Sequence, residues 1–310
     1  HSPQEPGQEA AVVDLFLKEG VRRVSASAFM RLTPDVVRYT ALGLERAADG
    51  SVARRNHVFA KVSRAEVAEP FMSPAPEKML RELVAAGKIS EAQAELASKV
   101  PVAAEITAEA DSGGHTDNRA ATVLYTSLSA ARARVCARHG LDESSIRIGL
   151  AGGLATPASL AAAFQMGAAY VLTGSVNQSA VESGLSEAGR KMLAKAGPAD
   201  VAMAPAADMF EQGVEVQVLK RGTLFAMRGR KLHGFYRSGA SYETLPESDR
   251  KWIDEVIGEP FNTAWTATRT YIQRVNPAEA KRADEDGNKR LALVARRYLF
   301  QGAQWAREGE

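Results

Sequence analysis

The strongest constraint on the fold of this chain comes from two consecutive strand-like segments. Each of them ends in a turn of small residues. The first, Ile146–Ala151, runs into Gly152-Gly153, and the second, Ala169–Thr173, runs into Gly174-Ser175. Glycines let an anion approach backbone N–H groups closely. Between the two segments, Thr156-Pro157 predicts a capped helix start, whose dipole favours an anion at the same place.

The predicted helix covers Pro157–Met166 and ends at Gly167, a residue type that commonly terminates helices. Two such turns after consecutive strands are typical of the seventh and eighth strands of a (β/α)8 barrel, which bind a phosphate group. The alternative is an ordinary βαβ unit with glycine turns. The group attached to the phosphate stays open at this point, with a sugar, a nucleotide and a flavin as alternatives.

Three earlier apolar segments complete a series of five predicted strands, each followed by a polar loop and a helix: Val21–Ser27, His57–Val62 and Val100–Ile106. This order is typical of an α/β protein with a parallel sheet. A complete barrel has eight strands and about 250 residues. Because the chain starts abruptly without Met, we expect an N-terminally truncated TIM-type barrel that holds strands four to eight within residues 1–178.

The pattern changes after the fifth strand to helices and irregular loops, including a predicted helix over Ala206–Gly213. We interpret residues 179–287 as a helical lid or substrate subdomain inserted after the last strand. Residues 288–310 form one amphipathic segment, which we expect to be the closing helix of the barrel.

Composition excludes several classes of protein. The 310 residues are 45% hydrophobic and 25% charged, which suits a globular chain of one or two domains. The net charge, 39 − 37 = +2, argues against a dedicated nucleic-acid binder. Cys136 is the single cysteine and His57, His139 and His233 lack metal-ligand spacing, so we expect neither a disulfide nor a metal site. No membrane span or signal peptide is visible, and a reducing cytoplasm fits best.

Gly113-Gly114-His115 lies in the loop after the third of the five predicted strands. Active sites of β/α barrels lie at the carboxyl ends of the strands, so His115 is the candidate proton donor or acceptor, with a loop-capping histidine as the alternative. The two glycines allow the backbone to approach a planar ring. Glu109, Asp111 and Asp117 could orient the imidazole. Lys61, at another strand end, could meet an anion, although a surface lysine is the default.

Five longer motifs are distinctive: Glu109–Arg119, Thr173–Gln178, Ala204–Glu211, Val218–Phe225 and the opening His1-Ser2-Pro3. They resemble the PfaD-type trans-acting enoyl reductases of polyunsaturated fatty acid and polyketide synthases, which belong to the nitronate monooxygenase-like flavin barrels. The resemblance runs along essentially the whole chain.

The resemblance implies an FMN-containing barrel in which NADPH reduces the flavin, and in which hydride then passes to the β-carbon of a 2-enoyl thioester on an acyl carrier protein. It implies that His115 lies at the flavin. The implied cofactor-binding residues are Gly152, Gly153, Gly174 and Ser175 at the FMN phosphate, together with Gly113, Gly114, Lys61 and Glu109. The basic residues that could dock the acidic carrier protein are Lys220, Arg221, Arg228, Arg230 and Lys231, with an ordinary solvated basic surface as the alternative.

Other functions stay open on the sequence. They are a nitronate monooxygenase-like flavin oxidase, a non-catalytic assembly module of a synthase, and a sugar-phosphate isomerase. The oligomeric state is also open, with a homodimer as one alternative.

Overall fold

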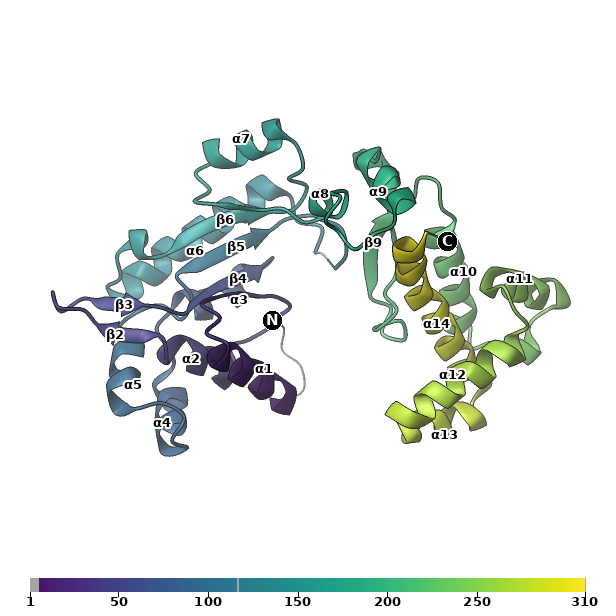
Figure 1. The fold of residues 1–310 in the computed structure, drawn as a ribbon, viewed down its shortest axis with the longest axis horizontal. Helices are drawn as coiled ribbons and strands as arrows, with labels where there is room; N and C mark the ends of the chain where they lie inside the picture. The colour runs from purple at the N-terminus through teal and green to yellow at the C-terminus, as the bar shows by residue number, and fades with distance from the viewer. Residues whose placement is uncertain (1–5, 116, 310) are drawn as a thin grey trace. The chain divides into compact units, whose positions relative to one another are not determined.

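The computed structural model describes residues 6–115 and 117–309, so the opening His1-Ser2-Pro3 lies outside the described residues. The chain divides into two compact units (Figure 1). Unit 1 comprises residues 1–112 and 116–173, and unit 2 comprises residues 113–115 and 174–310. Apart from residues 113–115, the boundary between the units falls at 173/174, and the predicted division at 178/179 and 287/288 stays a prediction.

Unit 1 is built on a five-stranded parallel sheet in the order β1-β4-β5-β6-β7 (Figure 1). The prediction of five parallel strands is thus confirmed, although the third begins later than predicted. The strands are β1 (Arg23–Ala26), β4 (His57–Val62), β5 (Glu105–Glu109), β6 (Arg147–Ala151) and β7 (Val171–Leu172). Each strand after β1 pairs with the one before it in this list, so the sheet grows in one direction along the chain. All five carboxyl ends consequently lie along one edge, as in a β/α barrel wall.

Helices connect these strands, and a short antiparallel pair, β2 (Leu44–Arg46) and β3 (Val52–Arg54), adds to unit 1. The helices are α1 (Pro6–Lys18), α2 (Pro34–Ala41), α3 (Ala65–Met72), α4 (Glu77–Ala85), α5 (Glu91–Ala97), α6 (Ala121–His139) and α7 (Pro157–Gln165). Helices α3 and α6 pack on each other and on the sheet. Their apolar side chains join the strands in one core.

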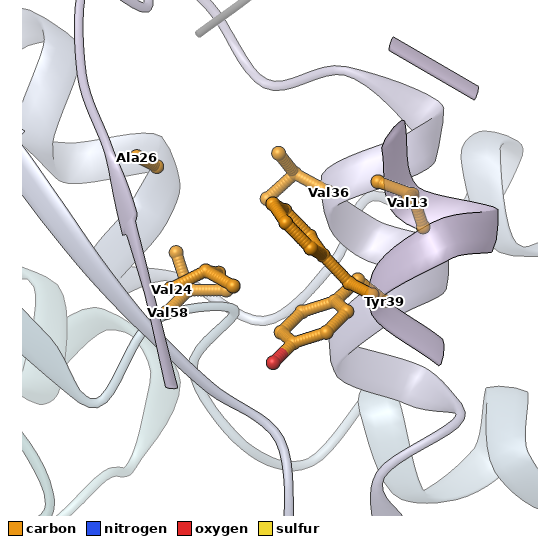
Figure 2. Close-up of a pocket in the computed structure, with 7 residues that line it drawn as sticks. Val13, Val24, Ala26, Val36, Tyr39 and Val58 are labelled. Carbon is orange, nitrogen blue, oxygen red and sulfur yellow. The ribbon is translucent and has the colours of Figure 1, made fainter. Parts of the chain in front are cut away.

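A narrow gap in this core lies between α1 and α2 on one side and β1 and β4 on the other (Figure 2). Only apolar side chains and the Tyr39 ring line it, and it has no room for a water molecule. The Tyr39 hydroxyl donates a hydrogen bond to the Val21 carbonyl oxygen (2.8 Å). The gap is therefore a packing feature of the core rather than a ligand site.

The strand predicted over Val100–Ile106 was placed too early, because β5 covers Glu105–Glu109. The apolar residues before it are held by another segment: the amides of Val102 and Ala103 donate to the carbonyls of Ser73 and Phe71, at 2.9 and 2.8 Å. These donors are therefore not available to the sheet, and the strand begins only after them.

A buried carboxylate ties together the amino ends of β4, β5 and β6. Glu105 is 1% exposed, and its Oε1 accepts from Arg147 Nη2 and lies 3.1 Å from His57 Nδ1. The neighbouring Arg54 donates to the carbonyls of Pro101 and Val102, and burial lowers the pKa of this guanidinium to about 10 although Glu105 opposes the shift. This cluster lies at the sheet edge opposite to the carboxyl ends of the strands, where stability rather than chemistry is expected.

Unit 2 combines helices with an antiparallel hairpin, β8 (Val201–Pro205) and β9 (Glu215–Leu219). Its helices are α8 (Ser175–Gln178), α9 (Glu187–Ala194), α10 (Phe225–Arg237), α11 (Glu247–Ile257), α12 (Phe261–Val275), α13 (Pro277–Glu285) and α14 (Gly287–Glu308). The predicted helix over Ala206–Gly213 is wrong. These residues form the hairpin loop, because the Ala206 amide donates across it to the Val214 carbonyl (2.8 Å).

Helix α14 is the centre of the unit 2 core and packs on α10, α12 and α13 (Figure 1). Glycines allow the closest approaches between α14 and α10. A Cβ atom on Gly302 would lie 2.4 Å from the Phe225 ring, and one on Gly229 would lie 3.1 Å from Leu299. The role predicted for residues 288–310 in closing the barrel stays a prediction. Among the described residues, no helix combines the length and apolarity needed to cross a membrane.

Candidate functional site

The first glycine turn follows β6 as predicted, and backbone geometry requires glycine there. Gly152 and Gly153 have φ angles of +99° and +67°. A Cβ atom on Gly152 would lie 2.6 Å from the Ala110 carbonyl oxygen, whereas one on Gly153 would find its nearest neighbour at 3.9 Å. Gly152 thus brings the ends of β5 and β6 together. Within the described residues, the amides of both glycines have no hydrogen-bond partner, so they are available to an anion.

This geometry gives a matched pair of variants. We expect Gly152→Ala to lower the free energy of unfolding by about 2–4 kcal/mol, since it combines a left-handed backbone with an overlap of backbone atoms. Gly153→Ala should cost only about 1–2 kcal/mol, because only the backbone conformation opposes it. Urea unfolding followed by circular dichroism measures both. Equal losses in the two variants would contradict the assignment of the close contact to Gly152.

The helix after this turn begins as predicted. Thr156 caps α7, its Oγ1 accepts from the Ser159 amide (3.2 Å), and Pro157 occupies the first turn. The Ser159 hydroxyl in turn accepts from the amides of Ala155 and Thr156, at 3.2 and 3.0 Å. The amides of Ala155, Thr156 and Ser159 are therefore already satisfied, whereas those of Gly152 and Gly153 have no acceptor within the described residues.

Lys61 and Glu109, both predicted to bind the cofactor, form an ion pair at the carboxyl ends of β4 and β5. Their side chains are 21% and 18% exposed. The pair balances the lysine charge inside unit 1, so an anion that binds Lys61 competes with Glu109.

The loop that carries His115 is anchored in unit 1 at its far side. Asp117 accepts two hydrogen bonds from Arg64, from Nε at 2.9 Å and Nη2 at 3.0 Å, and a third from the Ser63 hydroxyl. The Arg64 bonds are the largest cause of a pKa of about 2 for the Asp117 carboxyl. Within unit 1, Asp117 thus pairs with Arg64 and Glu109 with Lys61, and the orienting roles predicted for Glu109, Asp111 and Asp117 stay predictions.

The tip of the same loop belongs to unit 2. Gly114 forms a two-way backbone bridge with Gln217 in β9, with N–H to O distances of 2.9 and 2.8 Å. A Cβ atom on Gly113 would lie 3.0 Å from Ser175 Oγ, so the loop backbone passes close to this hydroxyl. The structure therefore brings together four predicted site residues within unit 2: Gly113, Gly114, His115 and Ser175.

Ser175 begins α8, and Gly174 precedes it as the N-cap residue. The two predicted phosphate turns belong to different units, with Gly152-Gly153 in unit 1 and Gly174-Ser175 in unit 2. Their joint use stays a prediction.

The His115 side chain is 54% exposed, and its Nε2 lies 3.8 Å from Asp208 Oδ1. Asp208 lies in the β8–β9 hairpin loop and was missed as a site residue because that segment was predicted to be a helix. The alternation of polar and apolar residues over Glu215–Leu219, directly after Gly213, is a strand signal that could have revealed the hairpin. The described residues hold no cluster of three or more potential metal ligands.

Two of the five basic residues predicted to dock a carrier protein are engaged within unit 2. Arg221 donates to the Lys195 carbonyl (3.0 Å) and to Asp200 (3.3 Å). Lys231 pairs with Asp249 (3.0 Å) and lies 4.2 Å from the Trp252 ring centroid. The other three of the five, Lys220, Arg228 and Arg230, have no ion pair within the described residues.

Comparison with solved structures identifies the family. The enoyl reductase domain of MlnA, from the macrolactin biosynthesis cluster of Bacillus amyloliquefaciens, matches with a TM-score of 0.90. It is 32% identical, and the match covers 100% of this chain and 70% of that chain. The chain belongs to the PfaD-type enoyl reductases.

Curated relatives of this chain include a polyunsaturated fatty acid synthase subunit and a polyketide biosynthesis protein. The chain is 46% identical to a polyunsaturated fatty acid synthase subunit of a Thraustochytrium strain, over 100% of this chain and 21% of that protein. It is 38% identical to the polyketide biosynthesis protein PksE of Bacillus subtilis, over 100% of this chain and 40% of that protein. The chain thus spans less than half the length of either relative.

One family model matches the C-terminal part of this chain. It describes the inserted helical domain of [acyl-carrier-protein] S-malonyltransferase and covers residues 240–310. These residues include α11 to α14, which form much of the unit 2 core.

Proposed function

We propose that this chain is part of an FMN-dependent enoyl reductase that acts in trans on 2-enoyl thioesters carried by an acyl carrier protein. The observation that carries the proposal is the loop of Gly113-Gly114-His115, fixed on β9 in a chain that matches an enoyl reductase domain along its whole length. NADPH would supply the hydride by way of FMN.

The residues of unit 1 fit the phosphate of FMN. The amides of Gly152 and Gly153, which have no partner among the described residues, lie at the carboxyl end of β6. Lys61 lies at the end of β4, where the phosphate would compete with Glu109 for its charge. When bound, FMN would supply hydride transfer to the β-carbon of the substrate. We assign Gly174, Ser175, Gly113 and Gly114 to the same cofactor.

His115 would act after hydride addition, when the substrate carries negative charge and needs a proton. Addition of hydride to the β-carbon leaves negative charge on the α-carbon and the thioester oxygen. The imidazole can hydrogen-bond that oxygen or give a proton to the α-carbon, since it exchanges protons near neutral pH. Its half-exposed position leaves the ring accessible to a substrate.

Docking of the carrier protein would use those predicted basic residues that have no internal ion pair. Lys220, Arg228 and Arg230 have no ion pair within the described residues, so their charges can attract an acidic partner. Arg221 and Lys231 would contribute less, since each already has an internal partner.

The test uses the full-length protein that contains this chain. We expect flavin absorbance in the purified protein and, without oxygen, NADPH oxidation that depends on a crotonyl-loaded carrier protein and yields the saturated thioester. A colourless protein that takes up no FMN would refute the proposal. Oxygen consumption with alkyl nitronates, without enoyl reduction, would assign an oxidase instead.

A further inference from the structure

We propose that Asp208, in the β8–β9 hairpin loop, is the positioning residue that orients the His115 imidazole. This inference rests on the proposed function of His115. It adds a residue of unit 2 to the reaction and gives the hairpin a role beyond packing.

The backbone beside His115 is fixed, but its side chain is not. The Gly114–Gln217 bridge adds the loop tip to the free edge of β9. The ring itself is 54% exposed, and Asp208 supplies its ion pair within the described residues. The 3.8 Å between Nε2 and Oδ1 exceeds a hydrogen bond of about 3 Å by less than 1 Å. A small rotation of either side chain closes this gap.

Asp208 itself lies on an anchored segment. On one side of it, Arg296 Nε donates to the Ala207 carbonyl (3.0 Å). On the other side, Phe210 is fully buried with its ring edge-on to His233 at 4.9 Å between centroids. Glu211 then accepts from Lys289 Nζ at 2.6 and 2.7 Å. These contacts hold the loop backbone on α10 and α14. The backbone position of Asp208 is therefore fixed.

The charged side chains that anchor the hairpin loop pair with one another and do not pair with Asp208. Lys289 also bonds to Glu279 (2.7 Å), and Arg296 lies 3.4 Å from both Glu211 and Glu279. Two cations and two carboxylates form this cluster, with side chains 14–26% exposed. Asp208, 57% exposed, takes no part in the cluster, and its carboxylate remains available to His115.

The pairing has a definite chemical consequence. A carboxylate at Nε2 fixes one ring orientation and one tautomer, in which Nε2 carries the proton that faces Asp208. Nδ1 is then the nitrogen left to meet the substrate. A protonated ring presents its exchangeable proton at Nδ1, where the thioester oxygen or the α-carbon would receive it.

The test compares variants of the full-length protein. We expect Asp208→Asn to lower kcat about 10- to 100-fold and to change KM less than about twofold. A positioned acid–base group supplies a rate factor of roughly 10²–10⁴, and losing its orientation should remove part of that factor. Asp208→Glu should restore part of the loss. In a protein that already carries His115→Ala, Asp208→Asn should cause no further loss, because the two residues act as a unit. Glu215→Gln, at the start of β9, is the control and should leave kcat unchanged.

A second readout does not depend on turnover. Ring ¹⁵N resonances of His115, assigned by their loss in His115→Ala, should shift in Asp208→Asn and not in Glu215→Gln. An unchanged spectrum, an unchanged kcat, or additive losses in the double variant would overturn the pairing. If His115→Ala retains full enoyl reduction while the His115 resonances still respond to Asp208→Asn, the pairing holds and the proposed role of His115 fails.

Discussion

Replacing His115 by alanine is expected to lower kcat for enoyl reduction by roughly 10²–10⁴, the contribution of a positioned acid–base group. The imidazole is the group that would hydrogen-bond the thioester oxygen or give a proton to the α-carbon. The loop is held by the backbone bridge between Gly114 and Gln217, which does not involve the His115 side chain. The variant should therefore fold normally and keep its flavin absorbance. Stopped-flow measurement of flavin reduction and substrate reduction separates the two half-reactions, and we expect only the second to slow.

His139→Gln provides the matched control. His139 is exposed in the last turn of α6, where its side chain faces solvent. This variant should retain wild-type turnover. Full activity in His115→Ala, with the same product, would show that another group or water supplies the proton.

Replacing Glu105 by alanine is expected to lower the free energy of unfolding by about 3–5 kcal/mol, the usual cost of removing one partner of a buried ionic cluster. The substitution leaves Arg54 buried without the carboxylate that faces it, and it removes the bonds to Arg147 and His57. Chemical unfolding measures the loss. Glu105→Gln keeps the shape but not the charge, so it should cost about 1–3 kcal/mol.

The control for this prediction is Glu77→Ala. Glu77 pairs with Arg81 on the exposed side of α4, with side chains 80% and 68% exposed. Solvent screens such pairs, so the loss should stay below about 1 kcal/mol. A Glu105→Ala protein as stable as Glu77→Ala would mean that the buried cluster relaxes freely around the missing carboxylate.

The parts of unit 1 that sequence predicted well are those with local signals. Thr156-Pro157 and Gly167 fix the start and end of α7 through contacts within a few residues, and the helix follows as predicted. The β5 segment was shifted because the amides of Val102 and Ala103 bind distant carbonyls instead of a strand. An apolar run alone does not reveal where its hydrogen bonds go.

In the candidate site, sequence singled out His115 and the glycines but not Asp208, whose carboxylate lies 3.8 Å from the ring nitrogen. Glu109 and Asp117, two of the three carboxylates predicted to orient the ring, pair with Lys61 and Arg64 in unit 1. Asp208 faces His115 because the β8–β9 hairpin forms and Gln217 binds Gly114. That contact depends on residues about a hundred positions apart, which no local pattern encodes.

By itself, the sequence determined the parallel α/β character of unit 1, the two glycine turns, the capped helix between them and the histidine loop. These features follow from short-range sterics and hydrogen bonding, which a few neighbouring residues specify. Only the tertiary structure decided that the loop tip groups with unit 2, and which carboxylate pairs with which cation or with His115. These pairings depend on long-range packing, because the tertiary fold determines which charged side chains lie close enough to interact.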